Sequence, residues 1–328
     1  MVVEVQALIS GLLAGDRGSV ARALNLLEDH RPAARSQAAK LLTALPKERL
    51  HEKGHLVGIT GPPGVGKSSL ASALIRHWRR EGRRVGILAV DPSSPLSGGA
   101  LLGDRLRMLR PEPDKDLFIR SLAGRGELGG LSADVFPMSQ VMLAAFDVVL
   151  VETIGVGQTE VDVVMHTDTT CLVAQPASGD MIQFLKAGIV ELPVIFAVNK
   201  ADLGMVAQRA ASELRASLPR DTAEGGWQVP VLLLSARDGE GIGALVTTLD
   251  AHRAWLADAG ALIAQRREHS AAWGLKRLAH EFGCFGVEAL GGDDELRRRW
   301  RETKGSAFEV LEALRREHLA AWDRTLET

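Results

Sequence analysis

Short apolar runs and longer amphipathic stretches alternate through the middle of the chain. Seven runs are mostly apolar at consecutive positions, and they span residues 56–60, 85–90, 117–121, 147–152, 170–175, 194–199 and 230–235. Segments long enough to form helices separate them. Continuous apolar strands that alternate with helices indicate a parallel sheet buried on both faces. The pattern therefore predicts an α/β fold with a mostly parallel sheet covered by helices on both sides.

The two ends of the chain have a helical pattern instead. In the first fifty residues, apolar side chains recur at helical spacing, Asp16 to Ser19 resembles a capped helix start, and Pro32 breaks the run. Near the other end, apolar stripes such as Trp273 and Leu278 alternate with charged residues. We predict three regions, namely an N-terminal helical extension at 1–53, a central α/β domain at 54–255 and a C-terminal helical region at 256–328.

The overall composition narrows the class of protein. The 328 residues carry a net charge of −2, which gives no reason to expect nucleic acid or an anionic membrane as a partner. The sequence has no run of about eighteen apolar residues, and Glu4 precedes every basic residue, unlike in a secretory signal. The two cysteines, Cys171 and Cys284, lie far apart, which indicates a reducing compartment. We expect a cytoplasmic protein that binds neither nucleic acid nor membrane.

A glycine-rich segment follows the first apolar run and precedes a helix-like stretch from Leu70 to Trp78. It reads Gly61-Pro62-Pro63-Gly64-Val65-Gly66-Lys67-Ser68-Ser69 and matches the phosphate-binding loop G-x-x-x-x-G-K-[ST]. Its glycines allow several backbone N–H groups to face one anion at a helix N-terminus. We expect Lys67, solvent-facing while the site is empty, to contact the β- and γ-phosphates, and Ser68 to ligate Mg²⁺. The chain is predicted to bind a nucleotide.

Two later segments identify the base as guanine. The sixth apolar run closes with Asn199-Lys200-Ala201-Asp202, which matches the N-K-x-D base-recognition motif. The Asp202 carboxylate can accept from N1–H and from the exocyclic amine of guanine, whereas adenine would leave it unpaired. The seventh run is followed by Ser235-Ala236-Arg237, which fits the S-A-[KR] loop that backs guanine. The order of the motifs behind a phosphate loop predicts GTP and GDP as ligands.

Three further loops follow predicted strands and carry polar residues. The first contains Asp91 and, after several glycines, Asp104. Two carboxylates at the sheet edge that bears a phosphate loop suit a hard cation. The second begins at Glu152, where ordinary GTPases have an aspartate, and the third contains Gln183 and Lys186. From the residues alone, the two aspartates could instead be solvated in a mobile surface loop, and Lys186 could be a lysine on a surface helix.

Together these segments resemble the MeaB/ArgK-type GTPases, a group of P-loop metallochaperone GTPases that attend adenosylcobalamin-dependent acyl-CoA mutases. The resemblance covers almost the whole chain and rests on segments 61–69, 91–108, 120–131, 152–160, 179–191, 199–202 and 235–241. It implies a P-loop NTPase fold and a GTP-hydrolysing chaperone that gates cobalamin loading and protects or reactivates a mutase such as methylmalonyl-CoA mutase. It also implies a homodimer that is joined through the C-terminal helices.

The resemblance also implies roles for individual residues. It places Mg²⁺ at Ser68, Asp91, Asp104 and Glu152. It places catalytic roles at Lys67, Glu152, Gln183 and Lys186, the last two in a switch loop through which the mutase stimulates hydrolysis. The sequence departs from the family pattern at Ala177, Ser178, Pro193 and Val194. These departures leave the nucleotide motifs intact, and they leave open which mutase is served.

A GTP-dependent nickel chaperone for hydrogenase or urease maturation is the alternative that shares this GTPase core. Such a protein needs three or four convergent nitrogen or sulfur ligands. Here His51 and His55 flank a glycine and have no partner cysteine nearby in the sequence. An ATP-dependent kinase is disfavoured by the guanine motifs. The basic stretch from Arg297 to Arg301 follows three acidic residues, which favours a solvated helix face or an interface over a nucleic-acid site.

Overall fold

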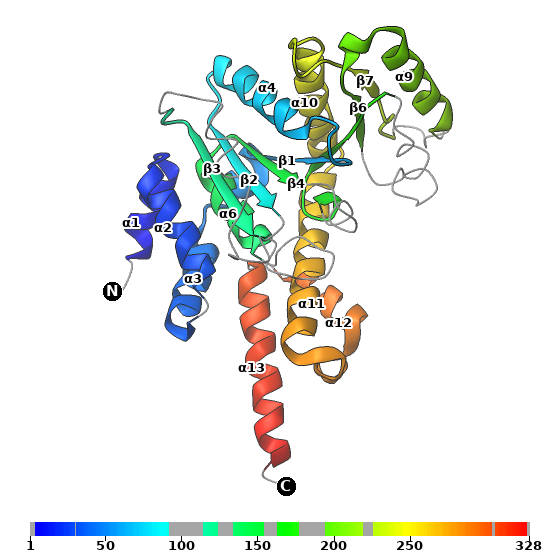
Figure 1. The fold of residues 1–328 in the computed structure, drawn as a ribbon. Helices are drawn as coiled ribbons and strands as arrows, with labels where there is room; N and C mark the ends of the chain where they lie inside the picture. Colours follow the sequence, from blue (N-terminus) through cyan, green and yellow to red (C-terminus); the bar gives the residue numbers. More distant parts are fainter. Residues whose placement is uncertain are drawn as a thin grey trace, which may run out of the picture.

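The computed structural model describes residues 4–29, 31–91, 114–123, 134–153, 163–176, 194–218, 226–303 and 306–326. Within these ranges the centre of the molecule is a seven-stranded sheet in the order β3-β2-β4-β1-β5-β6-β7 (Figure 1). All neighbouring strands run parallel. The strands are β1 (His55–Thr60), β2 (Val85–Asp91), β3 (Leu117–Ala123), β4 (Val148–Thr153), β5 (Thr169–Ala174), β6 (Ile195–Val198) and β7 (Val231–Leu233).

Each predicted apolar run forms a strand, so the predicted α/β fold class is confirmed. β1 and β5 are buried along their whole length, which explains why their sequences are apolar without alternation. The last strand differs most from its prediction, because β7 ends at Leu233 rather than at Ser235. The backbone N–H of Ser235 donates to the carbonyl of Glu240 at 3.0 Å, and this turn takes the chain out of the sheet.

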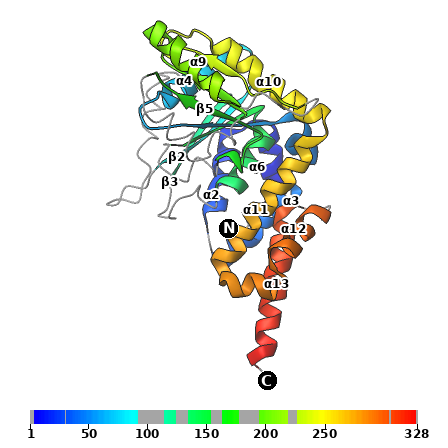
Figure 2. The same ribbon diagram turned by 90° about the vertical axis from the view of Figure 1, so that its right-hand side faces the viewer.

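Helices cover both faces of the sheet (Figures 1 and 2). The sheet separates two apolar cores. Successive residues of β2 point to opposite faces, so Ile87 packs in one core and Leu88 in the other. The Ile87 core includes apolar residues of α4 (Lys67–Arg80) and α10 (Ile242–Asp258). The Leu88 core includes α6 (Val135–Ala145). A smaller apolar cluster joins α9 (Met205–Ser217) to β6 and β7. The short helix η3 (Ala201–Leu203) precedes α9 in the chain.

The N-terminal helices pack on the α6 side of the sheet. They are α1 (Val5–Leu13), α2 (Arg17–Glu28), α3 (Pro32–Ala44) and the short π-helix η1 (Arg49–Lys53). The carboxylate of Asp16 accepts from the backbone N–H of Ser19 at 2.7 Å, so the predicted cap of α2 is confirmed. Pro32 lies in the first turn of α3, where a helix needs no backbone N–H.

The C-terminal helices extend away from the sheet and end in a projecting arm (Figures 1 and 2). They are α11 (Ala261–Ala289), α12 (Gly292–Glu302) and α13 (Ala307–Leu326). A Cβ at Gly274 of α11 would lie 2.1 Å from the indole ring of Trp300, so this glycine lets α12 approach closely. The N-terminal helices, α6 and the C-terminal helices share one apolar core. The boundaries of the three regions stay a prediction.

Two further expectations concern the membrane and the cysteines. In the described part of the chain, no helix is both long enough and apolar enough to cross a membrane. Cys171 is buried, Cys284 is exposed, and both are free thiols, which agrees with their separation in the sequence. Burial raises the pKa of the Cys171 thiol to about 12.

Candidate nucleotide-binding site

The phosphate loop lies between β1 and α4, as its sequence predicts. Gly61 has a φ of 141°, and a Cβ there would lie 2.2 Å from the carbonyl oxygen of Val173 in β5. Gly66 has a φ of 94°, and a Cβ there would lie 2.5 Å from the side-chain nitrogen of Asn199. Only glycine fits these two positions without displacing its neighbours. The loop is therefore packed tightly against β5 and against the start of the base-recognition motif.

The side chain of Lys67 is buried in the phosphate loop, so the expectation that it faces solvent is wrong. Lys67 is only 6% exposed, and its ammonium donates to the carbonyl oxygens of Gly61 at 2.6 Å and Pro62 at 2.8 Å. A buried ammonium needs such acceptors, and the turn of the loop supplies them. The position of Lys67 in the motif did not reveal this, because a motif fixes the residue but not the direction of its side chain.

Ser68 and Glu152 meet beside the loop. Glu152 lies in β4, in register with Ile59 of β1, and is 3% exposed. The Ser68 hydroxyl donates to its carboxylate, with 2.7 Å between Oγ and Oε1. A hydroxyl and a carboxylate at this point offer the hard oxygen donors that Mg²⁺ prefers. Glu152 replaces the usual aspartate, yet it still places a carboxylate beside Ser68, the residue that follows the P-loop lysine.

The remaining predicted metal and catalytic residues are only partly within the structure. Asp91 is the last residue of β2, and its neighbour Val90 pairs in register with Thr153 of β4. The backbone of Asp91 therefore reaches the same sheet edge as Glu152. Asp104, Gln183 and Lys186 lie outside the described residues, as do Ala177, Ser178 and Pro193. Their predicted roles stay predictions.

Asn199 connects the phosphate loop to the base-recognition loop. Its side chain is buried, and the amide nitrogen donates to the carbonyl oxygen of Val65 at 2.8 Å. The amide oxygen accepts from the backbone N–H of Ala236 at 3.0 Å. The two ends of one side chain thus hold segments that are far apart in sequence. A shift in either segment would disturb the other.

The carboxylate of Asp202 has two partners, Ser235 and Arg237. Ser235, fully buried, donates to its Oδ1 at 3.0 Å, and Arg237 lies 3.2 Å from its Oδ2. Arg237 is 71% exposed and also pairs with Asp238. Hydrogen bonding to Asp238 and the charge of Asp202 raise the pKa of Arg237. Ser235 therefore orients the base-recognition carboxylate, while an exposed guanidinium neutralises it.

Sequence reasoning assigned no role to Gln175 or Asp238. The ammonium of Lys200 contacts the side-chain oxygen of Gln175 and the carbonyl oxygen of Gly64, the latter at 3.1 Å. Lys200 has a φ of 65°, a left-handed conformation that costs free energy in a non-glycine residue. Asp238 accepts from Ser235 at 3.3 Å. A carboxylate three residues after Ser235 was the signal that could have identified it.

Within the described part of the chain, His51, His55 and the basic stretch each have identifiable surroundings. His51 lies in η1, whereas His55 is buried in β1 and bonds to Thr169 with 2.9 Å between Nε2 and Oγ1. Among the described residues, no group of three or more His, Cys, Asp and Glu side chains could hold a metal ion. Arg297 pairs with Glu268 at 2.7 Å, and Arg298 pairs with neighbouring glutamates of α12. The basic stretch is therefore a helix face with its own counter-ions.

Comparisons with known proteins find relatives that are named as GTPases. The family model described as methylmalonyl Co-A mutase-associated GTPase MeaB matches residues 20–282. A Mycobacterium bovis protein named "Probable GTPase" is 40% identical over 278 residues, covering 82% of this chain and 81% of the relative. The mouse "Methylmalonic aciduria type A homolog, mitochondrial" is 34% identical over 284 residues, covering 82% of this chain and 68% of that protein.

A solved structure extends the similarity to the whole fold. The crystal structure described as "LAO/AO transport system kinase" covers 100% of both chains, with a TM-score of 0.69 and 25% sequence identity. The similarity therefore includes the N-terminal and C-terminal helices as well as the central sheet.

Proposed function

The chain belongs to the MeaB family of methylmalonyl-CoA mutase-associated GTPases, and we propose that it uses GTP to gate adenosylcobalamin loading and to protect or reactivate an acyl-CoA mutase. GTPase activity follows from membership of the family. The chaperone role and the mutase partner are what we propose. The family match over residues 20–282 is the observation that carries it. The mutase would be methylmalonyl-CoA mutase or a close relative.

Selection of GTP rests on the base-recognition loop. Asp202 would accept from N1–H and the exocyclic amine of guanine after Arg237 moves aside, which its exposure allows. Ser235 keeps one carboxylate oxygen in place, so little reorganisation accompanies binding. Adenine lacks the paired donors, so it could not replace the contact with Arg237 that Asp202 would give up. Asn199 would transmit occupation of the base pocket to the phosphate loop through its contacts with Val65 and Ala236.

Phosphate binding and hydrolysis would use Lys67, Ser68 and Glu152. The ammonium of Lys67, held by loop carbonyls in the empty site, would exchange those acceptors for phosphate oxygens. Mg²⁺, held by Ser68 and Glu152 together with Asp91 and Asp104, would neutralise charge that develops on the phosphates. The Ser68–Glu152 contact supports this assignment, because it brings two oxygen donors together at the start of α4.

Stimulation by the mutase would act on the loop that contains Gln183 and Lys186. The phosphate-loop and switch motifs offer no arginine finger, so hydrolysis by the isolated chain should be slow. The partner would order this loop and bring its polar groups to the γ-phosphate. Gln175 begins the segment, and its contact with Lys200 links it to the base-recognition motif.

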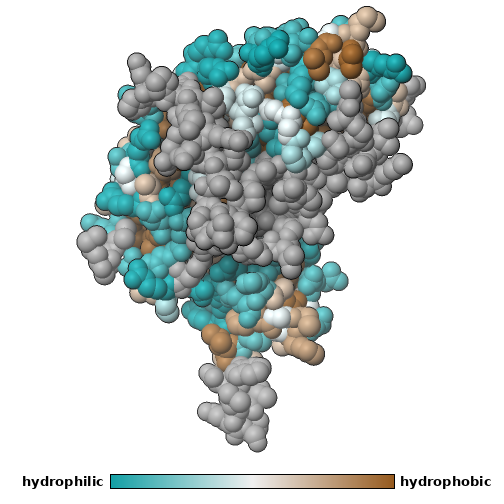
Figure 3. All heavy atoms as spheres, viewed as in Figure 1, coloured by the Kyte–Doolittle hydropathy of each residue, from teal (hydrophilic) through white to brown (hydrophobic). Residues whose placement is uncertain are grey.

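We further propose that the chain forms a homodimer through its C-terminal helices. Phe285 in α11 is 87% exposed, and Leu319 in α13 is 55% exposed. The two helices touch at this point, because the rings of Phe282 and His318 have centroids 4.2 Å apart. Figure 3 shows hydrophobic surface at the base of the arm. Large exposed apolar side chains on two helices that contact each other favour an interface.

The proposal is tested by GTP hydrolysis with and without saturating methylmalonyl-CoA mutase. The parent chain should hydrolyse GTP slowly alone and faster with the mutase. Lys186→Ala should keep its nucleotide affinity and slow basal rate but lose the acceleration. Lys115→Ala, which changes an exposed lysine on a different segment, is the matched control and should respond like the parent.

Three outcomes would contradict parts of the proposal. A Lys186→Ala variant that is accelerated as strongly as the parent would remove the switch assignment. A parent chain that no cobalamin-dependent mutase accelerates or retains in a pull-down would remove the chaperone role. Recovery of a hydrogenase or urease component in that pull-down would replace it with the nickel-chaperone alternative.

A further inference from the structure

A cavity of about 430 Å³ lies away from the nucleotide site, where the N-terminal helices, α6 and the C-terminal helices meet. Its wall includes Leu56 near the start of β1, whereas the phosphate loop follows the opposite end of that strand. The volume falls within the roughly 300–1,000 Å³ of typical small-molecule sites. The lining residues named below lie in the described part of the chain.

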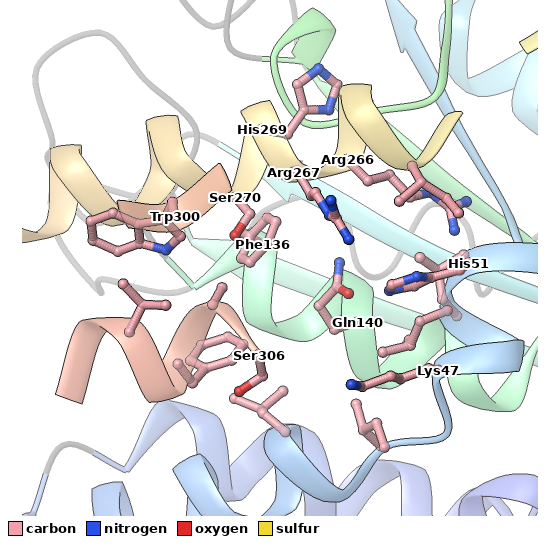
Figure 4. Close-up of a pocket in the computed structure, with 18 of the residues that line it drawn as sticks. Lys47, His51, Phe136, Gln140, Arg266, Arg267, His269, Ser270, Trp300 and Ser306 are labelled. Atoms are coloured by element: carbon pink, nitrogen blue, oxygen red, sulfur yellow. The ribbon is translucent and has the colours of Figure 1, made fainter. Parts of the chain in front are cut away.

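One end of the cavity is polar and positively charged. Figure 4 shows the side chains of Lys47, His51, Gln140 and Arg267 converging there from η1 and its approach, α6 and α11. Among the described lining residues Asp168 is the only acid, and it is bound by Arg266 with 2.7 Å between Nε and Oδ1. Among the described residues of the cavity wall, no acid is therefore left to pair with Arg267.

The pKa of His51 is affected by the positive charges at this end of the cavity. Burial lowers the pKa of His51, and the charges of Arg266, Arg267 and Lys47 lower it further. Arg267 itself forms no hydrogen bond or ion pair with any residue that the structure describes. Gln140 adds amide donors beside the cations. An anion placed here would gain charge-assisted hydrogen bonds without breaking an ion pair of Arg267.

The other end of the cavity is aromatic and apolar. Phe136, Trp300 and Phe308 line it, and the ring centroids of Phe136 and Phe308 are 6.2 Å apart. Trp300 is 4% exposed, and its indole N–H has no hydrogen-bond partner among the described residues. The hydroxyls of Thr43 and Ser306 lie 3.0 Å apart on the same wall. This end suits an apolar body and offers only a few polar contacts.

We propose that this cavity is a second binding site, separate from the nucleotide site, for a small organic anion with an apolar body. Its acidic group pairs with Arg267 and Lys47, and its apolar part lies against Phe136, Trp300 and Phe308. Because the wall is built from α3, α6, α11, α12 and α13, an occupant holds the two ends of the chain together against the sheet. The inference does not depend on the identity of the protein partner.

The test is a fluorescence titration of the full chain with 8-anilinonaphthalene-1-sulfonate, an aromatic anion, while saturating GDP occupies the nucleotide site. Its neutral analogue, N-phenyl-1-naphthylamine, is titrated in parallel. The parent should bind the anion saturably at one site and the neutral analogue about tenfold more weakly, since a charge-assisted contact is lost. Binding of the anion should also raise the Tm of the chain.

Variants assign the binding to the cavity. Arg267→Glu and Lys47→Gln should weaken anion binding by about tenfold or more through loss of charge-assisted contacts. Ser270→Phe, which fills the cavity, should abolish it. Lys40→Glu, at an exposed position of α3 outside the cavity, should change the affinity less than about twofold because it alters only a distant screened charge. Arg267→Glu is expected to fold normally, because the parent side chain has no described partner to lose.

Several results would overturn the inference. Unchanged affinity in both Arg267→Glu and Ser270→Phe would place the dye elsewhere on the molecule. Loss of binding in Phe285→Ser with retention in Arg267→Glu would assign it to the exposed C-terminal surface. Equal affinities for the anion and its neutral analogue would remove the anion class. If Ser270→Phe fails to give the parent circular dichroism spectrum, Ala307→Leu on the facing wall replaces it under the same criteria.

Discussion

Single side chains hold the loops of the candidate nucleotide site in a defined shape. Lys67 binds two carbonyls of its own loop, Asn199 spans two loops, and Ser235 fixes Asp202. Each of these groups is buried and polar, so each needs its partner to offset desolvation. Nucleotide binding would therefore exchange existing hydrogen bonds rather than capture free groups. Loss of one side chain should affect both the empty and the occupied site.

Asp202→Asn should weaken GDP binding by about 1–3 kcal/mol, because an amide cannot accept both guanine donors in the same way. The measurement is isothermal titration calorimetry. Asp238→Asn is the control, since Asp238 also pairs with Arg237 and Ser235 but is 47% exposed and lies outside the base-recognition motif. Equal GDP affinities for Asp202→Asn and the parent chain would refute the guanine contact.

Lys67→Ala should abolish GTP hydrolysis and also lower the free energy of unfolding of the nucleotide-free chain by about 1–3 kcal/mol. The second effect follows from the carbonyls of Gly61 and Pro62, which lose their buried donor. Urea denaturation and a phosphate-release assay measure the two effects. Lys53→Ala, at a side chain that is 56% exposed, should leave both unchanged. Undiminished turnover in Lys67→Ala would mean that the loop does not serve catalysis.

His252 gives the stability of the chain a pH dependence. Burial lowers the pKa of His252 to about 4 from its usual value of 6.5. The unfolded chain therefore binds a proton more readily between these values, so stability is complete above pH 6.5 and falls as the pH drops toward 4. Going from pH 7.5 to pH 5 should cost about 2 kcal/mol from this group.

The measurement for this prediction is urea denaturation at the two pH values. His252→Gln can keep a hydrogen bond to Thr169, whose hydroxyl lies 2.9 Å from Nδ1, but it cannot titrate. The difference between the two pH values should therefore be smaller in the variant by about 2 kcal/mol. His77→Gln, at a partly exposed position of α4, is the control. An equal pH dependence in parent and His252→Gln would exclude this residue as its source.

The elements differ in how far their sequences determine them. The apolar runs predicted the positions of the strands, because a strand buried on both faces consists mostly of apolar residues. The order β3-β2-β4-β1-β5-β6-β7 did not follow, since it depends on contacts between distant segments. The cap at Asp16 was visible because Asp16 and Ser19 are neighbours in sequence. Helix ends such as those of α12 and α13 depend on packing that no local pattern reports.

For the candidate site too, the sequence predicted the local motifs but not the contacts between distant segments. Motifs located the phosphate loop and the base loop, because these functions require particular residues at fixed spacing. They did not reveal that Asn199 joins the two loops or that Lys67 turns inward, since both depend on tertiary packing. The cavity lined by Lys47, Gln140 and Arg267 was invisible for the same reason, because its walls come from opposite ends of the chain.

The phosphate loop and α4 also permit a test at the level of an element. Gly64 and Gly66 both have positive φ, but a Cβ at Gly64 meets no atom within 4 Å, whereas one at Gly66 would lie 2.5 Å from Asn199. Gly64→Ala should cost about 1 kcal/mol from backbone strain. Gly66→Ala should cost about 1–3 kcal/mol more because Asn199 must move. Equal free energies of unfolding for the two variants would show that Asn199 does not constrain the loop.

At the scale of the whole molecule, the C-terminal helices combine buried, paired charges with exposed apolar side chains. Glu281 of α11 pairs with Arg277 at 3.1 Å and with Arg315 of α13, and all three side chains are less than one-fifth exposed. Beside these satisfied charges, Phe285 and Leu319 remain exposed. A chain that buries its polar groups well yet leaves large apolar ones in water is suited to bind another surface.

Phe285→Ser should therefore weaken the proposed homodimer. The parent chain should sediment as a dimer at micromolar concentration, and the variant should raise the dissociation constant by about tenfold or more, as expected for a central aromatic contact. Met205→Ser is the control, because Met205 is 83% exposed but lies in α9, far along the chain from the C-terminal helices. Sedimentation velocity over a concentration series gives the constants, and basal GTP hydrolysis checks that each variant is folded. A monomeric parent, or a dimer that responds to Met205→Ser but not to Phe285→Ser, would exclude the C-terminal helices as the interface.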